Sequence, residues 1–164
     1  MQSQKQGFEF LSKHQFTYKQ FCSIVDRNEN TIRTWISRYL PNIGCQKGNS
    51  SWMLYSGLDC VKTVIFSELL DLSLSREASK VICLSAQRRV RELALLAEGS
   101  IYAAQKNPKF MVIAQAGATT VSGHRAISAF SLAQMVEAVD TPSVLLPVDA
   151  IFWRVTAALK KMAT

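Results

Sequence analysis

The sequence lacks the short motifs that mark most enzymes and metal proteins. There is no C-x-x-C pair, and neither His14 nor His124 completes a zinc-ligand spacing with the cysteines. There is also no phosphate-cradling glycine loop, no H-E-x-x-H and no nucleophile elbow. We therefore expect no enzymatic activity, no cofactor and no metal. The free thiols that we expect to be buried or half-buried are Cys22, Cys45, Cys60 and Cys83.

Long apolar stretches are missing as well. The longest stretch without a charge, residues 110–124, contains Gln115, Gly117 and Thr119, which makes it too short and too polar to span a bilayer. The first residues, MQSQKQGFEFLSK, contain no apolar segment of the kind found in secretory signals. These absences predict a cytoplasmic protein that has no membrane partner.

Acidic residues are scarce relative to basic ones. The 164 residues include 19 Lys and Arg against 12 Asp and Glu, which gives a net charge of +7. Residues 11–47 alone hold six basic and two acidic side chains, an excess of +4. Such a bias is typical of proteins that bind polyanions, although a solvated basic surface would show it too. With 48% hydrophobic residues, the chain can bury a core without disulfides or metal.

Two short helices joined by a tight turn are predicted near the N-terminus. Thr17 and Gln20 form a capping box that begins a helix over residues 17–25. The turn-favouring residues 26–29 follow, and a second helix over residues 28–39 stops before Pro41. On the second helix Ile32, Trp35 and Ile36 share the inner face, and polar or basic residues cover the rest. This arrangement is a helix-turn-helix, whose second helix suits insertion in a major groove.

A β-hairpin and two helices are predicted next. Residues 42–55 combine a Gly, Asn and Ser-rich tip with the run Trp52-Met53-Leu54-Tyr55, a pattern typical of a hairpin, or wing, beside the helices. We expect Trp35, Trp52 and Tyr55 to be core aromatics. One helix follows over residues 57–70, and another begins at Ser73 or Ser75 and includes Ile82.

A longer helix is predicted over residues 85–105. Its apolar stripe is either core or a short coiled-coil seam between two chains. We assign it to homodimerisation. The stripe consists of Val90, Leu93, Ala97, Ile101 and Ala104.

The remaining residues form a small α+β unit. Strands are expected over residues 110–115, 124–130 and 143–146, and helices over residues 131–139 and 147–161. The fold class is therefore mainly α with small β elements. It divides into a winged helix-turn-helix domain (residues 11–84), a linking or dimerisation helix (85–105) and a small α+β assembly or sensor domain (106–164).

The order of these elements resembles the N-terminal domain of the MerR family of bacterial transcription regulators. The resemblance rests on FTYKQFCSIVDRNENTIRTWISR and on WMLYSGLDCVKTVIFSELLDLSLSREASKVI. It matches a Thr31-Ile32-Arg33 triplet on the recognition helix, an aromatic at Trp35, a wing that closes on Tyr55, and an early helical Asp59.

This sequence departs from the family pattern at several positions. Asp26 stands at the turn glycine, Ser73 at the glycine of a later turn, Thr34 at a tyrosine, and Met53 at a wing arginine that normally reaches a phosphate. Arg27 replaces an apolar residue after the turn. Asp tolerates unusual turn geometry, so the turn itself should survive.

The resemblance implies a dimeric regulator that binds double-stranded DNA and distorts promoters, with RNA polymerase as a further partner. The recognition helix would lie over residues 28–39 and the wing over residues 42–55. No small-molecule effector is identified. The residues expected at the DNA are Tyr18, Lys19, Asn30, Thr31, Arg33, Thr34, Ser37, Arg38, Lys47, Asn49, Ser50 and Lys62.

Two other functions fit the same residues. One is an architectural DNA-binding factor such as a phage-type excisionase, which needs the same head but no sensor. The other is a protein-interaction module whose basic face is incidental. Genomic context and an effect on a neighbouring promoter would discriminate them from a regulator.

Overall fold

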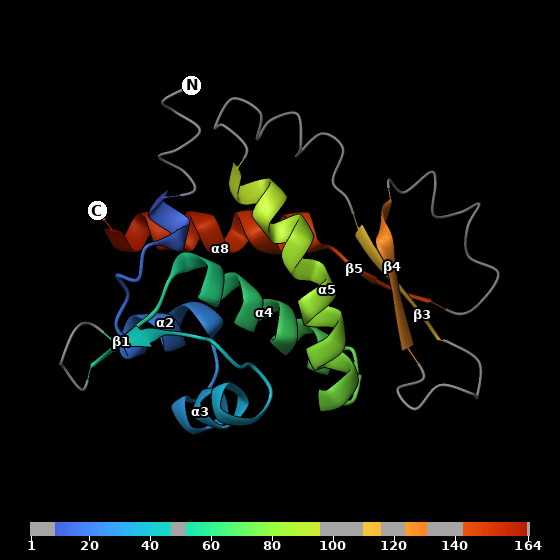
Figure 1. The fold of residues 1–164 in the computed structure, drawn as a ribbon, viewed down its shortest axis with the longest axis horizontal. Coiled ribbons are helices and arrows are strands. Elements are labelled where there is room, and N and C mark those ends of the chain that lie inside the picture. Colours follow the sequence, from blue (N-terminus) through green and yellow to red (C-terminus); the bar gives the residue numbers. More distant parts are fainter. Residues whose placement is uncertain (1–8, 47–51, 96–109, 116–123, 131–142, 164) are drawn as a thin grey trace.

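Helices make up most of the protein in a computed structural model. The fold is mainly helical with small β elements, as predicted (Figure 1). Within the described residues, no helix combines the length and the apolar character needed to cross a membrane. The structure describes residues 9–46, 52–95, 110–115, 124–130 and 143–163.

The two short helices predicted near the N-terminus are present as α2 (Tyr18–Val25) and α3 (Glu29–Arg38). The capping box is confirmed: Gln20 donates its backbone N–H to the Thr17 hydroxyl at 3.4 Å, and Thr17 donates its own to the Gln20 side chain at 2.9 Å. Asp26 ends α2 in the left-handed region, with φ 55°. The Asn28 side chain then accepts the Asn30 N–H at 2.9 Å and begins α3.

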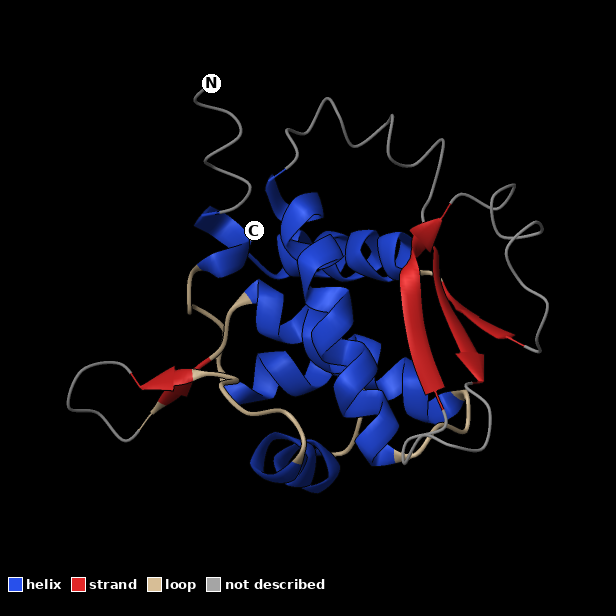
Figure 2. Ribbon diagram, turned by 45° about the vertical axis from the view of Figure 1, so that its right-hand side comes forward, coloured by secondary structure: helices blue, strands red, loops and turns tan. Residues whose placement is uncertain are grey.

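The predicted hairpin is formed by β1 (Cys45–Gln46) and β2 (Met53–Leu54), which pair antiparallel. Its base is attached to the start of α2, because Phe16 and Tyr55 exchange backbone hydrogen bonds of 3.0 and 2.9 Å. In Figures 1 and 2 the hairpin projects away from the helices.

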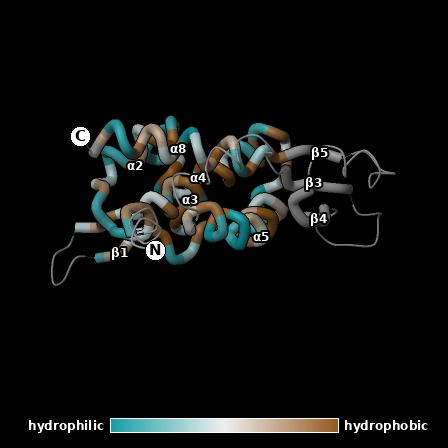
Figure 3. The backbone as a smooth tube through the Cα atoms, turned by 90° about the horizontal axis from the view of Figure 1, so that it is seen from above, coloured by the Kyte–Doolittle hydropathy of each residue, from teal (hydrophilic) through white to brown (hydrophobic). Residues whose placement is uncertain are grey.

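The middle of the molecule is α4 (Gly57–Asp71), which is buried along most of its length. A second capping box begins it: Ser56 and Asp59 each accept the other's backbone N–H, at 3.1 and 2.9 Å. The early Asp59 is therefore a capping residue. In Figure 3 the hydrophobic stretches of the chain gather around α4, between α8 and α5.

One long helix, α5 (Arg76–Leu95), replaces the two helices that the sequence predicts on either side of residues 83–85. The expected break is wrong because nothing there stops a helix. The Ser85 hydroxyl donates to the Val81 carbonyl at 3.2 Å, so it bonds back along the same helix and does not cap a new one. The expected part of the long helix beyond residue 95 lies outside the described residues.

The last described helix, α8 (Val148–Ala163), packs against α4 and α5. The sequence assigns it to a separate small unit, yet Phe152, Val155 and Leu159 share one buried cluster with α4 and α5. Val90 and Leu93 belong to the same cluster. These two residues are therefore core, and the prediction that they contact a second chain is wrong. Ala97, Ile101 and Ala104 lie outside the described residues.

Two ion pairs fasten α8 to its neighbours. Arg89 of α5 donates to both oxygens of Asp149, from Nε at 2.9 Å and from Nη2 at 2.7 Å. Asp149 is 1% exposed and the Arg89 side chain 14%. On the surface, Arg154 of α8 lies 2.6 Å from Glu68 of α4.

The three predicted strands of the C-terminal part are confirmed as β3 (Phe110–Gln115), β4 (His124–Phe130) and β5 (Ser143–Leu146). They form an antiparallel sheet in the order β4-β3-β5, with Met111 opposite Leu146. The sheet lies at one end of the helices, beside α5 and α8 (Figure 2). The helix predicted over residues 131–139 lies outside the described residues.

Candidate nucleic-acid interface

The α3 helix has one buried face and one polar, exposed face. Ile32 and Trp35 are buried, and the Trp35 ring meets Phe66 of α4 edge-on at 5.4 Å between centroids. Because the apolar stripe takes up the inner face, the polar residues between its members must point outward. All six predicted DNA contacts on this helix are exposed: Asn30, Thr31, Arg33, Thr34, Ser37 and Arg38.

Two hydroxyls on this face are held by the helix itself. Thr34 donates its hydroxyl proton to the Asn30 carbonyl at 2.9 Å, and Ser37 donates to the Thr34 carbonyl at 3.1 Å. Each oxygen keeps lone pairs that can accept a hydrogen bond from another molecule. The face therefore presents oriented acceptors as well as charge.

The guanidinium of Arg33 lies over the ring of Tyr18 of α2. Its guanidinium carbon lies 5.9 Å from the centre of the Tyr18 ring. The Tyr18 hydroxyl donates to the Glu29 carbonyl at 2.6 Å, and burial raises the pKa of Tyr18 to about 12. Across the described ranges, no carboxylate lies within 4.0 Å of Arg33, Arg38 or Lys19. These three cations are therefore unneutralised by ion pairs there.

A groove of about 580 Å³ runs between α2, α3 and β2. Lys19 and Arg33 line one part of it, and Trp52 and Met53 line another. The groove, which Glu29 also lines, continues the surface of α3 toward the hairpin.

Trp52 is exposed, with 77% of its surface accessible, and its predicted place in the core is wrong. Tyr55 does lie in the core, where its ring stacks on Phe21 at 4.4 Å between centroids. The indole lines the groove beside α2 and α3 and is open to solvent. The predicted contacts at the hairpin tip, Lys47, Asn49 and Ser50, lie outside the described residues.

Lys62 is not brought together with the α3 face. Its ammonium donates to the Pro41 carbonyl at 3.2 Å. It lines a second cavity, of about 370 Å³, that shares no residue with the groove.

In the described ranges three residues other than glycine have a positive φ, and two of them lie in turns between helices. Asp26 has φ 55° and Ser73 has φ 62°, and both stand where the MerR pattern has glycine. Arg27, next to the first turn, donates from Nε to the Ser67 hydroxyl at 2.8 Å and pairs with Asp71. The sequence marks Arg27 as a departure without showing this contact, which fixes the turn to α4.

The cysteines form no site in the part of the chain that the structure describes. Cys22, Cys60 and Cys83 are buried, and burial raises the pKa of Cys83 to about 12. Cys45 is exposed on β1, which corrects the expectation that all four thiols are covered. Among the described residues, no three His, Cys, Asp or Glu side chains come close enough to hold a metal ion.

Comparison with known proteins adds no assignment. No family model matches the chain, and no curated protein matches it. The α3 face and the adjoining groove are therefore the features from which a function can be inferred.

Proposed function

We propose that this protein binds double-stranded DNA sequence-specifically, as a MerR-like transcription regulator with α3 in the major groove and the hairpin beside it. The observation that carries the proposal is the outer face of α3. It presents six exposed polar or basic side chains, and its two arginines have no ion-pair partner in the described residues.

The dimensions of α3 suit this role. Its ten residues span about 15 Å at 1.5 Å per residue. The major groove, at about 12 Å wide, admits one such helix, and the first residues of a recognition helix contact base edges. Asn30 and Thr34 would read bases, while Arg33, Arg38 and Lys19 would neutralise phosphates.

The two turns support the resemblance independently of charge. A left-handed residue at Asp26 sets the angle between α2 and α3, and Ser73 sets the angle between α4 and α5. Both fall where the MerR pattern has glycine. A chain that needs left-handed geometry at those positions is consistent with that family's head.

We extend the proposal to a homodimer that binds an inverted repeat, since two-fold symmetry pairs two related half-sites. Val90 and Leu93 are buried, so within the described part of α5 the contact would use the exposed Val81 and Leu84. Light scattering should give a dimer mass, and the double change V81K/L84K should give a monomer. A monomeric wild-type chain, free and on DNA, would contradict this extension.

The experiment that tests DNA binding is a selection from random duplexes, with sequencing of those that the purified protein retains. We expect one enriched motif. For a MerR-like regulator this motif should occur in a promoter of a bacterial or phage genome. Affinity for that duplex should fall steeply with salt, because each Lys or Arg at a phosphate releases counterions. Affinity that stays flat between low and moderate salt would contradict the proposal, and an unenriched pool would favour the interaction module.

A further inference from the structure

The second cavity lies between α4, α5, the segment that leads from α3 to β1, and the residues before α2. Its volume of about 370 Å³ falls in the range of small-molecule sites. The apolar side chains of Ile65, Leu84 and Val90 line one part of it, and Lys62 and Arg91 bring positive charge from two different helices.

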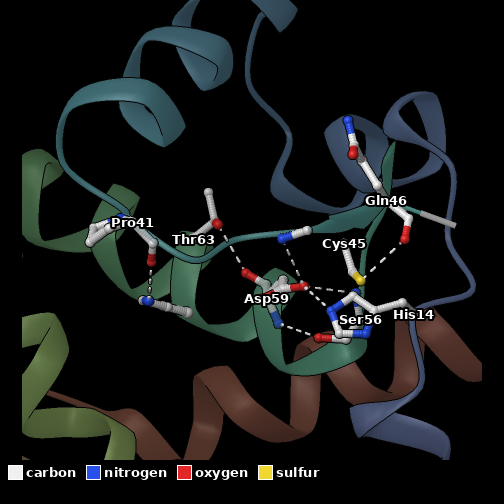
Figure 4. Close-up of polar contacts among 9 residues, drawn as sticks. His14, Pro41, Cys45, Gln46, Ser56, Asp59 and Thr63 are labelled. Carbon is white, nitrogen blue, oxygen red and sulfur yellow. Dashed lines mark hydrogen bonds and ion pairs between the residues drawn. The ribbon is translucent and has the colours of Figure 1, made fainter. Parts of the chain in front are cut away.

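The acidic residue of this cavity is already engaged. The Asp59 carboxylate accepts the backbone N–H groups of Ser56 at 2.9 Å and Gly44 at 3.3 Å, and it lies 3.6 Å from Nε2 of His14. Figure 4 shows the carboxylate beside the His14 ring and Ser56. All three contacts are made with Oδ2, and the two cations of the cavity outnumber this one carboxylate.

The two cations are available to such a ligand. Lys62 donates one hydrogen bond, to the Pro41 carbonyl at 3.2 Å, and an ammonium group has three donors. Arg91 is exposed, and no carboxylate lies within 4.0 Å of it in the described residues. Cys83, which also lines the cavity, stays a neutral thiol because burial raises its pKa to about 12.

We propose that this cavity binds a small organic anion. Its carboxylate or phosphate group meets Lys62 and Arg91, and its apolar part lies against Ile65 and Val90. Such a ligand combines the charge and the apolar surface that the walls present, and it needs no metal.

The cavity is connected to the hairpin. Pro41 follows α3, and Gly44, whose N–H is held by Asp59, precedes β1. A ligand anion that binds the spare donors of Lys62 acts on the same ammonium that holds the Pro41 carbonyl, and so on one of the contacts between this segment and α4. The hairpin then shifts relative to α3. This consequence rests on the proposed function, whereas ligand binding itself does not.

Binding is tested by calorimetric titration of the full chain, without DNA, using benzoate, phenyl phosphate and inorganic phosphate as probes. We expect saturable 1:1 binding of at least one aromatic anion, and the tighter of the two identifies the acid group. Inorganic phosphate should bind about tenfold more weakly, because it lacks the apolar part. No saturable binding of any probe, or inorganic phosphate binding as tightly as the aromatic anions, overturns the proposal.

Matched variants locate the site. Lys62→Met and Arg91→Met should each weaken binding about tenfold while circular dichroism stays unchanged. Arg88→Met removes an exposed arginine that lies on α5, as Arg91 does, but outside the cavity. This variant should bind the anion as the wild type does. Equal losses in Arg88→Met and Arg91→Met would overturn the proposal. If Arg91→Met misfolds, the result for Lys62→Met alone decides the question.

The link to DNA is measured separately. The tighter anion should change the affinity for the selected duplex, and the duplex should change the affinity for the anion by the same factor. If no duplex is ever selected, the proposed function fails while the titrations still test the cavity. If DNA binds and no anion does, the cavity proposal alone fails.

Discussion

The arginines on two sides of the molecule differ in whether they form ion pairs. Around α8, Arg89 and Arg154 each form an ion pair with a carboxylate of another helix. Arg27, in the turn after α2, pairs with Asp71 at the end of α4. On α3, Arg33 and Arg38 have no such partner within the described ranges. In Figure 1, α3 and α8 lie on opposite sides of α4.

This contrast shows which part of the net charge of +7 is available to attract an anion. A paired arginine contributes to folding and presents little field to a distant anion. An unpaired arginine on an exposed helix adds nothing to the core, yet it attracts phosphate at long range. The net charge of the sequence does not distinguish paired from unpaired arginines, since every arginine contributes equally to it.

The buried pair of Arg89 and Asp149 should be the most costly to break. Asp149→Asn leaves the Arg89 guanidinium without its carboxylate and should lower the free energy of unfolding by about 3–5 kcal/mol. Urea denaturation measures it. The matched control is Glu68→Gln, which removes the exposed partner of Arg154 and should cost less than about 1 kcal/mol. Equal losses would show that the buried pair is no stronger than the surface pair.

Arg33→Ala tests the unpaired side. Affinity for the selected duplex and for unrelated duplexes should fall alike, and the slope of log affinity against log salt should drop by about one unit, because one phosphate contact is lost. The melting temperature should stay unchanged. Arg154→Ala is the control, because it removes the same charge from α8. If both variants bind alike, α3 is not the DNA-reading helix.

Thr34→Ala should act through sequence rather than charge. Loss of its side chain should cost on the order of 1 kcal/mol at one or two base positions and leave the salt slope unchanged. A repeated selection with the variant measures the relaxed positions. Ser23→Ala, which removes an exposed hydroxyl from α2, should retain the wild-type motif. A uniform loss on every duplex would assign Thr34 a backbone contact instead.

A change at the turn after α4, which follows Asp71, should alter stability only slightly. Ser73→Gly should raise the free energy of unfolding by a few tenths to about 1 kcal/mol, because glycine adopts a positive φ without strain. Thermal denaturation measures the gain. Ser73→Ala should give none, since alanine keeps the Cβ that causes the strain. An equal gain in both variants would exclude the backbone explanation.

Local chemistry allowed much of the fold to be predicted from the sequence. Thr17 with Gln20 determines where α2 begins, because the cap groups lie three residues apart. The outward direction of Arg33 and Thr34 follows from the spacing of Ile32 and Trp35. Such features depend only on neighbouring residues, so a pattern along the chain is enough to find them.

Features that depend on distant residues could not be predicted. The burial of Val90 and Leu93 requires α8, whose sequence gives no sign of which helices it covers. Arg89 and Asp149 are 60 residues apart, and nothing local links them. The residue type of Trp52 predicts a core position, yet the indole is exposed, and its exposure depends on where the hairpin places it relative to α2 and α3.

The packing of α8 also has a consequence for synthesis on the ribosome. The core of α4 and α5 stays open until residues 148–163 have been translated, because those residues cover it. At about 5–20 residues per second, the roughly 50 residues between α5 and α8 take several seconds to emerge. During that interval the apolar surface of α4 is exposed to chaperones and to other nascent chains. A rare-codon pause between α5 and α8 would lengthen that exposure.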